Sequence, residues 1–369
     1  AIGKEAFKNC TSLSAADIGD GVTEIPYWAF YGCSALKEIT FGSSIATISE
    51  YAFSRTNVSK INISNLAGWL GISVGGFSFG VHDLYLDGAK VVTLNVPQQV
   101  TSISGIVNGA SFENVVIHDA VTSIAFGAFS SCENIQSATI PAFAASYLPK
   151  TLRTVKITSG DALPKEAFRG AVNLSEVTLC ADLDIGYMAF EGCTSLTSIE
   201  FPSGDRAVEI GYCAFYNCTA LAEVSLPQNL AEIGEMAFCN TALTEVVVPS
   251  KVDYVGRGTF QNCNIHAITL PFVGEYSDGS GNTFLGHVFG TNEWNGQDDW
   301  IPSNLSTVVL TGGASIGMGA FSDCENLSAI TLPEELTSVG NAAFHNCYKL
   351  VEIFNNSSLE LVPGSTDYG

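Results

Sequence analysis

The sequence predicts a mostly β, right-handed solenoid of about fifteen coils, with short parallel strands and few helices. Three observations predict it: a motif that recurs about every 22 or 23 residues along the 369-residue chain, a high count of glycine (36), and a low share of charged residues (14%). A fixed period of roughly 20 to 50 residues is the signature of repeat proteins, in which each unit buries its apolar side only against its neighbours.

The first half of the motif centres on a phenylalanine that usually follows alanine, as in "IGYMAFEGC" (185–193). An aliphatic residue stands five positions before each of these phenylalanines. Burial of one such ring stabilises by roughly 1.5–3 kcal/mol, so we expect one buried ring in each coil. The phenylalanines are Phe7, Phe30, Phe53, Phe129, Phe168, Phe190, Phe215, Phe238, Phe260, Phe321 and Phe344.

The second half of the motif reads apolar-x-x-apolar-x-apolar, as in "LTSIEF" (196–201). Alternate apolar residues point to one side of a strand, and Pro202 ends this one because it has no backbone donor. We expect these strands to stack in parallel, about 4.8 Å apart. The fifteen starts are Leu13, Leu36, Val58, Val91, Phe112, Ile135, Leu152, Leu174, Leu196, Leu221, Leu243, Ile265, Leu305, Leu327 and Leu350.

A turn is predicted two residues after the motif phenylalanine, at the site just before cysteine. The residues found there tolerate left-handed backbone or bond to their own chain. They are Asn9, Gly32, Ser131, Gly192, Asn217, Asn262, Asp323 and Asn346.

Eight of the eleven cysteines share one position of the repeat, at which we expect reduced, buried thiols. Stacked coils would hold their Cβ atoms about 4.8 Å apart, whereas a relaxed disulfide needs about 3.8 Å. Cys180, Cys213 and Cys239 are out of register and are expected to be exposed. The eight are Cys10, Cys33, Cys132, Cys193, Cys218, Cys263, Cys324 and Cys347.

The charge balance excludes several classes of partner. With 15 basic and 37 acidic residues the net charge is −22, which repels nucleic acid and anionic lipid. No apolar run of about 18 residues predicts a membrane-inserted helix. The five histidines are scattered and no C-x-x-C pair occurs, so neither a metal site nor a cofactor is expected.

The combined motif "LxxIxLP…IGxxAFxxC" resembles the repeat of BspA-like leucine-rich repeat proteins over essentially the whole chain. The resemblance extends to the variant stretches at 65–97 and 270–294 and to the final "LVEIFNNSSLELVPGSTDYG". It implies a leucine-rich repeat solenoid, secreted or on the surface of a bacterium, that binds an extracellular protein or glycan, including host ligands. It also implies that the chain is a fragment of a longer protein.

Two intervals between motif starts are stretched, to 33 residues after Val58 and to 40 after Ile265. We therefore expect a single domain over 1–369 with insertions at about 66–90 and 272–302. Insertions in a solenoid usually emerge on one face, often the binding face.

The second insertion combines aromatic and acidic residues. Exposed aromatic rings beside acids suit sugar or peptide contacts, although the same rings could instead fold back over the solenoid. The predicted ligand-binding residues are Tyr276, Trp294, Trp300, Asp298 and Asp299.

Two other functions remain open alongside non-catalytic adhesion. A hydrolase would need two of the five insertion acids in one enclosed pocket. A structural spacer would display another domain. The acids are Glu275, Asp278, Glu293, Asp298 and Asp299.

Two short motifs lack the sequence context that their chemistry requires, so no catalytic residue and no metal site is predicted. "GFSFG" (76–80) matches the nucleophile elbow of serine hydrolases, but no helical pattern follows it. "DGSGN" (278–282) begins like a calcium loop, but Thr283 stands where that loop needs glycine.

Overall fold

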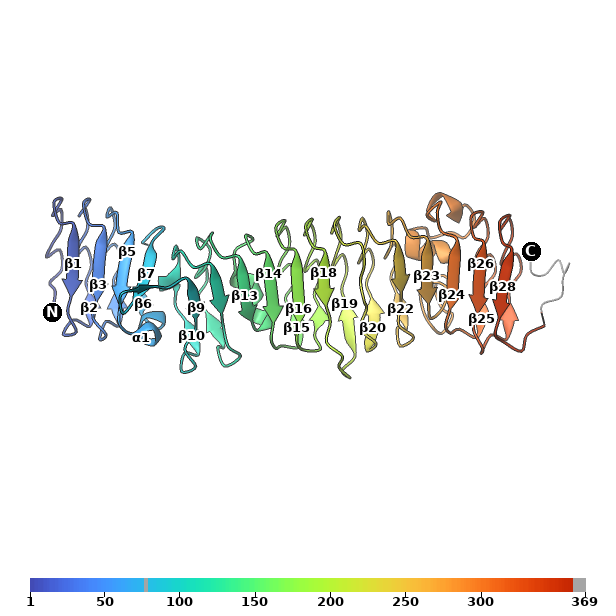
Figure 1. The fold of residues 1–369 in the computed structure, drawn as a ribbon, viewed down its shortest axis with the longest axis horizontal. Helices are drawn as coiled ribbons and strands as arrows, with labels where there is room; N and C mark the ends of the chain where they lie inside the picture. The colour runs from blue at the N-terminus through green and yellow to red at the C-terminus, as the bar shows by residue number, and fades with distance from the viewer. Residues whose placement is uncertain (76–78, 361–369) are drawn as a thin grey trace. The chain divides into compact units, whose positions relative to one another are not determined.

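Each repeat folds into one coil: a strand of three or four residues, a turn, a shorter strand, and a second turn that carries the motif phenylalanine (Figure 1). The structure, a computed structural model, describes residues 1–75 and 79–360. The chain divides into two compact units, Ala1–Thr158 (unit 1) and Ser159–Gly369 (unit 2), and each is a stack of such coils. The expectation of a single domain over 1–369 stays a prediction.

Unit 1 contains two wide and two narrow sheets. The first wide sheet pairs β1 (Ala15–Ile18), β3 (Glu38–Phe41), β5 (Lys60–Ile63) and β7 (Asp83–Leu86) in parallel and adds β8 (Ala89–Lys90). The second pairs β9 (Thr93–Asn95), β11 (Asn114–Val116), β13 (Ser137–Ile140) and β14 (Thr154–Ile157). The narrow sheets are β2 (Glu24–Ile25), β4 (Thr47–Ile48) and β6 (Ser73–Val74), and β10 (Ser102–Ile103) with β12 (Ser123–Ile124). The helical turns are α1 (Leu66–Leu70), η1 (Gly105–Val107) and η2 (Ala142–Tyr147).

Unit 2 repeats this arrangement. Its wide strands are β16 (Glu176–Leu179) with β18 (Ser198–Glu200), and then β21 (Glu245–Val247), β23 (Ala267–Leu270), β24 (Thr307–Leu310), β26 (Ala329–Leu332) and β28 (Glu352–Asn355). One narrow sheet is β15 (Ala162–Leu163), β17 (Asp184–Ile185), β19 (Val208–Ile210), β20 (Leu230–Ile233) and β22 (Tyr254–Val255). The other is β25 (Ser315–Ile316) with β27 (Ser338–Val339), and the helical turns are η3 (Leu285–Phe289) and η4 (Gln297–Asp299).

Most strands keep one register from coil to coil, which places like residues in rows. Between β19 and β20 the register shifts by one residue, at Val208 and Glu209. Ile39 pairs with Ile61, which pairs with Leu84, and all three are buried. The predicted class, a mostly β solenoid of parallel strands, is confirmed. Of the fifteen predicted strand positions, only the one that starts at Leu221 carries no strand, and β7 is a strand that the pattern missed.

The segment predicted as an insertion at about 66–90 is largely a coil of ordinary length. Helix α1 begins after Asn65, whose side chain accepts a hydrogen bond from the Gly68 N–H (3.0 Å). Strand β6 then pairs with β4, and β7 pairs in parallel with β5. The irregular part is the antiparallel β7–β8 hairpin, closed by Asp87 and Gly88, both left-handed, as a tight two-residue turn requires.

The motif phenylalanines form stacks of near-parallel rings inside each unit. Successive ring centroids are 5.0 to 5.9 Å apart, with interplanar angles of 3° to 15°. Such pairs contribute about 0.5–1.5 kcal/mol beyond simple burial. The stacked pairs are Phe7–Phe30, Phe30–Phe53, Phe168–Phe190, Phe190–Phe215, Phe215–Phe238, Phe238–Phe260 and Phe321–Phe344.

The backbone of the phenylalanine turn joins one coil to the next. The N–H of Phe190 donates to the carbonyl of Ala214 in the next coil (2.8 Å), and the N–H of Phe215 donates to Ala237 (2.7 Å). The predicted turn site before cysteine is left-handed at seven of eight positions, with Ser131 the exception. A second left-handed site, just before the alanine, is occupied by bulky residues such as Trp28 (φ 59°). Such backbone costs roughly 1 kcal/mol or more for a side chain of this size, so the inter-coil bonds must compensate for it.

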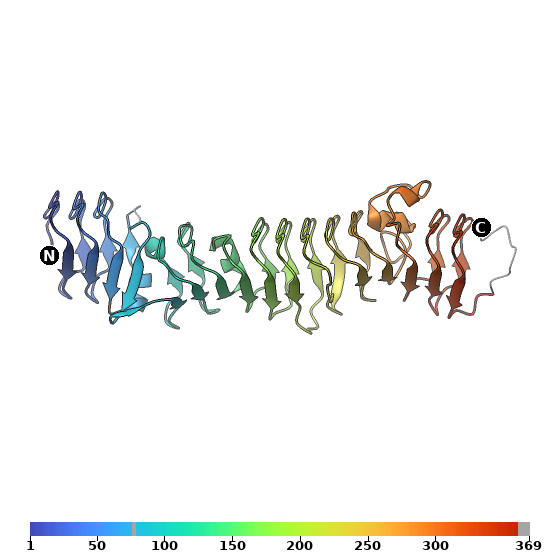
Figure 2. The same ribbon diagram turned by 45° about the horizontal axis from the view of Figure 1, so that its top comes forward.

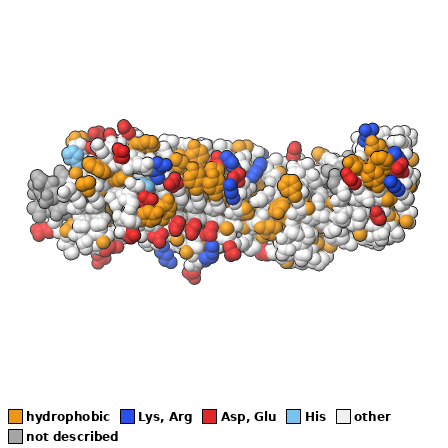
Figure 3. Space-filling view, turned by 180° about the vertical axis from the view of Figure 1, so that it is seen from behind, with side chains coloured by type: hydrophobic (Ala, Val, Ile, Leu, Met, Phe, Trp, Pro, Cys, Tyr) orange, Lys and Arg blue, Asp and Glu red, His pale blue; other side chains and the backbone are white. Residues whose placement is uncertain are grey.

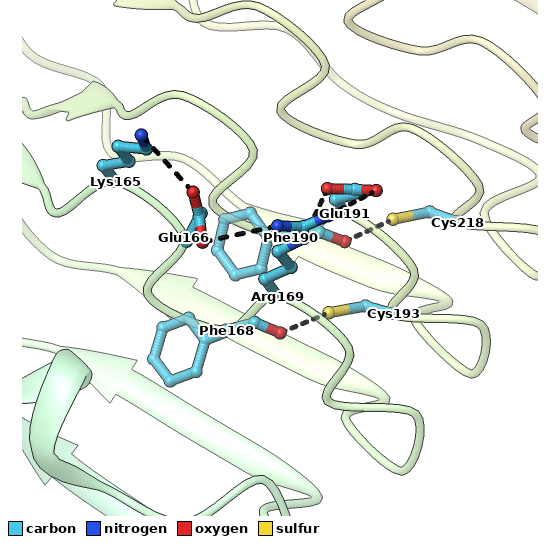
Figure 4. A network of polar contacts seen from close by, with 8 residues as sticks. All are labelled: Lys165, Glu166, Phe168, Arg169, Phe190, Glu191, Cys193 and Cys218. Carbon is cyan, nitrogen blue, oxygen red and sulfur yellow. Dashed lines mark hydrogen bonds and ion pairs between the residues drawn. The ribbon is translucent and has the colours of Figure 1, made fainter.

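The cysteine position bonds back to the preceding coil. Figure 4 shows two successive steps, in which Cys193 Sγ donates to the Phe168 carbonyl and Cys218 Sγ to the Phe190 carbonyl, both at 3.2 Å. Arg169 adds an ion pair between coils, 2.7 Å from Glu191. The thiol is therefore a hydrogen-bond donor as well as a small apolar filler.

Burial of the eight in-register cysteines is confirmed for six; Cys10 is exposed and Cys347 half-buried. The expectation that Cys213 and Cys239 are exposed is wrong, because both lie in the phenylalanine turn and are covered by the adjacent coils (4% and 3% exposed). Cys180 is exposed as predicted. Burial raises the pKa of Cys132 to about 11 and that of Cys239 to about 12, so these thiols stay protonated and unreactive at neutral pH.

Titration of the native protein with a thiol reagent should therefore label Cys10 and Cys180 fast and Cys347 slowly. The buried thiols should react only after denaturation, since the thiolate is the reactive form. A Cys10→Ser, Cys180→Ser double variant is the control and should lose the fast phase. Disulfide-linked peptides from neighbouring coils in a non-reducing digest would contradict this assignment.

Removal of one ring from the stack should be costly. Phe215→Ala should lower the free energy of unfolding by roughly 3–5 kcal/mol, because it leaves a cavity between two coils. Because each coil contacts mainly its neighbours, protection from hydrogen exchange should be lost first within about residues 190–240. Phe126→Ala, at a fully exposed ring, should change stability by less than about 0.5 kcal/mol. A uniform loss of protection through unit 2 would show that its coils unfold together.

Candidate binding site

The insertion at 272–302 leaves and rejoins the stack between two adjacent strands. Strand β23 pairs directly with β24, Ala267 facing Thr307 and Ile268 facing Val308, although 40 residues separate each pair. In Figures 1 and 2 the intervening chain, drawn in orange, stands out beside these strands at the turn edge of unit 2. The insertion is therefore built onto an uninterrupted sheet.

Helix η3 takes the place of one phenylalanine turn. The N–H of Phe260 donates to the Val288 carbonyl (2.9 Å), and the N–H of Leu285 donates to the Ala320 carbonyl (2.8 Å). These bonds copy the ladder that joins ordinary coils, so η3 connects the coil of Phe260 to that of Phe321. Leu285 and Phe289 are fully buried and fill the core position that an ordinary motif phenylalanine would fill.

A buried glutamine fastens the outer part of the insertion. The Gln297 side chain is fully buried; its Oε1 accepts from the Gly286 N–H (2.8 Å), and its Nε2 donates to the carbonyls of Gly319 (3.0 Å) and Ser322 (2.8 Å). Hydrogen bonds of this kind are expensive to leave unmade in a buried site. The residues that follow Gln297 are thus held in one position against unit 2.

The five predicted ligand-binding residues lie on this scaffold at different depths. Trp294 is half-buried against Gly319, where a Cβ would come within 2.6 Å of the indole ring. Trp300 and Tyr276 are 44% and 40% exposed, and Asp298 and Asp299 are exposed in η4. The structure therefore presents two of the three rings to solvent. A role of these five in binding stays a prediction.

Two of the insertion acids are engaged within the insertion itself. Glu275 Oε2 accepts hydrogen bonds from the Asn282 N–H (3.3 Å) and from its Nδ2 (3.0 Å). Asp278 Oδ1 accepts from the Ser280 N–H (2.8 Å), and the bonds with Ser280 lower the pKa of Asp278. Both acids thus shape the turn between 275 and 282.

The acids do not converge in the cavities that they line. Asp298 lines a cavity of about 120 Å³, and Asp278 lines two others, of about 540 and 90 Å³; none of the three holds a second insertion acid. Across residues 1–75 and 79–360, no three His, Cys, Asp or Glu side chains are grouped so as to hold a metal ion. The "GFSFG" motif lies partly at 76–78, outside the described residues.

The largest of these hollows was not foreseen from the sequence. It is lined by Glu232, Asp253, Tyr254, Tyr276, Ser277 and Asp278. It forms because the insertion runs antiparallel beside β22, with Tyr276 bridged to Tyr254 and the Ser277 N–H donating to the Asp253 carbonyl (2.9 Å). Glu232, Asp253 and Tyr254 belong to ordinary coils, so the repeat pattern gave no reason to select them.

His287 lies buried in η3 (2% exposed). Its Nε2 is 3.2 Å from the Val255 carbonyl, while Nδ1 is buried without a hydrogen-bond partner. Burial is the main cause that lowers the pKa of His287; Arg257 also lowers it, and Glu275 and Glu235 oppose the shift. A protonated His287 would carry a charge with little solvent around it.

A family model described as the BspA type leucine rich repeat region matches the chain in six copies, over residues 1–73, 85–159, 161–278 and 302–366. The search of curated proteins gave no match. The part of the chain that the structure describes contains no helix with the length and apolar character needed to cross a membrane.

Three of the similar solved structures are leucine-rich repeat or leucine-rich proteins of bacteria. One from Bacteroides ovatus is 19% identical over 95% of this chain and 68% of its own, with a TM-score of 0.32. The leucine-rich repeat protein of T. pallidum is 22% identical over 70% and 86%, also with a TM-score of 0.32. A leucine-rich cell surface protein from Faecalibacterium prausnitzii is 21% identical over 95% and 82%, with a TM-score of 0.27. The assignment of the chain to a family rests on the family model, which matches most of the chain, and not on these structures.

Acid should weaken the insertion through His287. Its pKa is lower in the folded protein than in the unfolded chain, so the unfolded chain binds the proton first. The stability that depends on neutral His287 is complete above about pH 6.5 and is lost as pH falls through the folded pKa. Urea midpoints measured by tryptophan fluorescence between pH 7 and 5 should fall less steeply in His287→Leu than in the unmodified protein.

His266→Gln is the matched control, because His266 is exposed and paired with Glu245 (2.8 Å). In His266→Gln the urea midpoint should fall between pH 7 and 5 at least as steeply as in the unmodified protein. An identical pH dependence of the unmodified protein and His287→Leu would show that His287 does not titrate in this range.

Proposed function

Since the chain belongs to the family of BspA type leucine-rich repeat proteins, we propose that it is a non-catalytic adhesion module, secreted or at the surface of a bacterium. Leucine-rich repeat solenoids are typically protein-interaction modules, because their stacked coils form long, rigid surfaces. Its ligand is an extracellular protein or glycan, and its site is the exposed side of the insertion at 272–302.

The observation that carries the proposal is the way the insertion is mounted. Its inner half is buried in the core of unit 2 and fastened by Gln297, while Trp300 and Tyr276 stay exposed. Exposed aromatic rings on a rigid support give contact area with little loss of conformational entropy on binding. The insertion therefore has the properties of a preorganised contact surface.

The regular coils offer no surface that occurs only once in the chain. Their rings stack on one another and their turn backbones bond to adjacent coils, so one coil resembles the next. A partner that binds at one place needs a feature that occurs once. The insertion is such a feature, with two of the chain's four tryptophans.

A non-catalytic role is supported by the separation of the insertion acids. Paired carboxylates hydrolyse glycosides only when both flank one cleft at a defined distance. Asp278 and Asp298 line different cavities, and Glu275 is engaged with Asn282. The other acids that line the cavity of Asp298 are Asp323 and Glu325, which belong to the next coil.

The test is a binding screen of the unmodified protein on immobilised glycans and extracellular-matrix proteins. Any ligand found should bind Trp300→Ala or Trp294→Ala about thirtyfold more weakly, the equivalent of roughly 2 kcal/mol for an aromatic contact. In Trp300→Ala, whose ring is the more exposed of the two, the free energy of unfolding should change by less than about 1 kcal/mol.

Phe126→Ala, which removes an exposed ring in unit 1, should leave the affinity unchanged. If both tryptophan variants keep full affinity and melt at lower temperature, the two rings are packing residues. The binding surface would then lie on the strand face of the coils.

A further inference from the structure

A row of acidic side chains follows the narrow sheet of unit 2. Asp184 on β17, Glu209 on β19 and Glu232 on β20 come from successive coils, with Glu209 paired to Glu232 and Glu232 to Tyr254. Neighbours in such a row are about 4.8 Å apart. Figure 3, seen from behind, shows acidic side chains following one another along this part of the molecule. The row ends at the hollow formed by Tyr254 and Tyr276.

The first acid of the row is already neutralised by an arginine of the chain itself. Arg206 Nη2 donates to Asp184 Oδ2 (2.9 Å) and its Nη1 to Oδ1 (3.2 Å), a two-pronged contact. Planar guanidinium groups match carboxylates in this way. The contact of Arg206 with Asp184 therefore shows that a guanidinium group can bind a carboxylate of this row with two hydrogen bonds.

The acids farther along have no such partner. In the part of the chain that the structure describes, Glu209, Glu232, Asp253 and Asp278 form no ion pair with a basic side chain. Burial is the main cause that raises the pKa of Glu232, and repulsion from the neighbouring Glu209 and Asp253 contributes a smaller part. A cation placed among them would relieve that repulsion.

The two tyrosines give the hollow an aromatic wall. Their ring centroids are 5.1 Å apart at 40°, and burial together with nearby carboxylates raises the pKa of Tyr254 to about 12, so its ring stays neutral. Cations are attracted to the faces of such rings. The chain uses the same contact itself, with Lys165 Nζ 4.7 Å from the centre of the Tyr187 ring.

We propose that the hollow of about 540 Å³ lined by Glu232, Asp253, Tyr254, Tyr276 and Asp278 binds an arginine side chain from an extended segment of a protein partner. The guanidinium stacks on the tyrosines and donates to the carboxylates, as Arg206 does to Asp184. Arginine fits better than lysine because its planar group can do both at once. This inference rests on the proposed binding function and names the chemistry that one part of the insertion recognises.

The test uses two pentapeptides that carry the same uncharged dye and differ only at the central residue, arginine or citrulline. Citrulline keeps the shape and removes the charge. Fluorescence anisotropy should show at least fivefold tighter binding of the arginine peptide, and this advantage should shrink as salt rises from about 50 to 500 mM, because salt screens exposed charges.

A Glu232→Gln, Asp253→Asn variant should lose the preference for arginine, and Tyr276→Leu should weaken binding of the arginine peptide at least threefold. Glu223→Gln is the matched control, since Glu223 lines a separate hollow of about 340 Å³ that contains no tyrosine. Circular dichroism should show that all these variants fold, because the substituted side chains are at least partly exposed.

Equal binding of the two peptides, no binding at millimolar concentration, or an unchanged preference in the double variant would each overturn the inference. A ligand from the screen that depends on Trp300 but binds the double variant normally would also overturn it, while leaving the proposed function intact. If Trp300→Ala binds that ligand with full affinity but the double variant does not bind it, the arginine site is supported. The proposal that the ligand contacts the exposed tryptophan is then contradicted.

Discussion

The structure depends on the inability of any single coil to bury its own phenylalanine. Each ring is covered by the rings of the coils before and after it, as in the stack of Phe190, Phe215 and Phe238. The same turn joins its neighbours twice: its backbone N–H bonds forward to the next coil, and its carbonyl accepts the next coil's thiol. Stability is therefore a property of adjacent coils, and left-handed backbone at residues such as Met188 is tolerated because these bonds hold it.

This arrangement explains how an insertion of some thirty residues can be accommodated. The stack would be interrupted between Phe260 and Phe321 unless something reproduced the inter-coil contacts. Helix η3 does so with the two backbone bonds of Phe260 and Leu285 and with a buried Phe289. Because η3 makes the same inter-coil backbone bonds as an ordinary coil, it fixes the insertion to the stack at both sides. Binding surfaces that are ordered before the ligand arrives lose less entropy on association.

The surface of the coils is acidic, and few basic residues are available to pair with its carboxylates. The repeat carries few basic residues, and three of them, Lys60, Arg169 and Arg206, bridge neighbouring coils. Among the described residues, Glu209, Glu232 and Asp253 then lie in neighbouring coils without a basic partner, because parallel stacking places like positions side by side. A surface of this composition attracts cations, and the proposed arginine site lies where the acidic row meets the insertion.

The sequence by itself determined the period, nearly all of the strand positions, the burial of the motif rings and the burial of most in-register cysteines, because each is repeated and each depends only on contacts between adjacent coils. It also located the insertion at 272–302. Only the tertiary structure decided that Cys213 and Cys239 are covered, since neighbouring turns bury them. It likewise decided that the segment after Val58 contains a regular coil, and that Tyr276 meets Tyr254, Glu232 and Asp253. These contacts join an insertion to ordinary coils, and a repeating pattern carries no information about what folds back onto it.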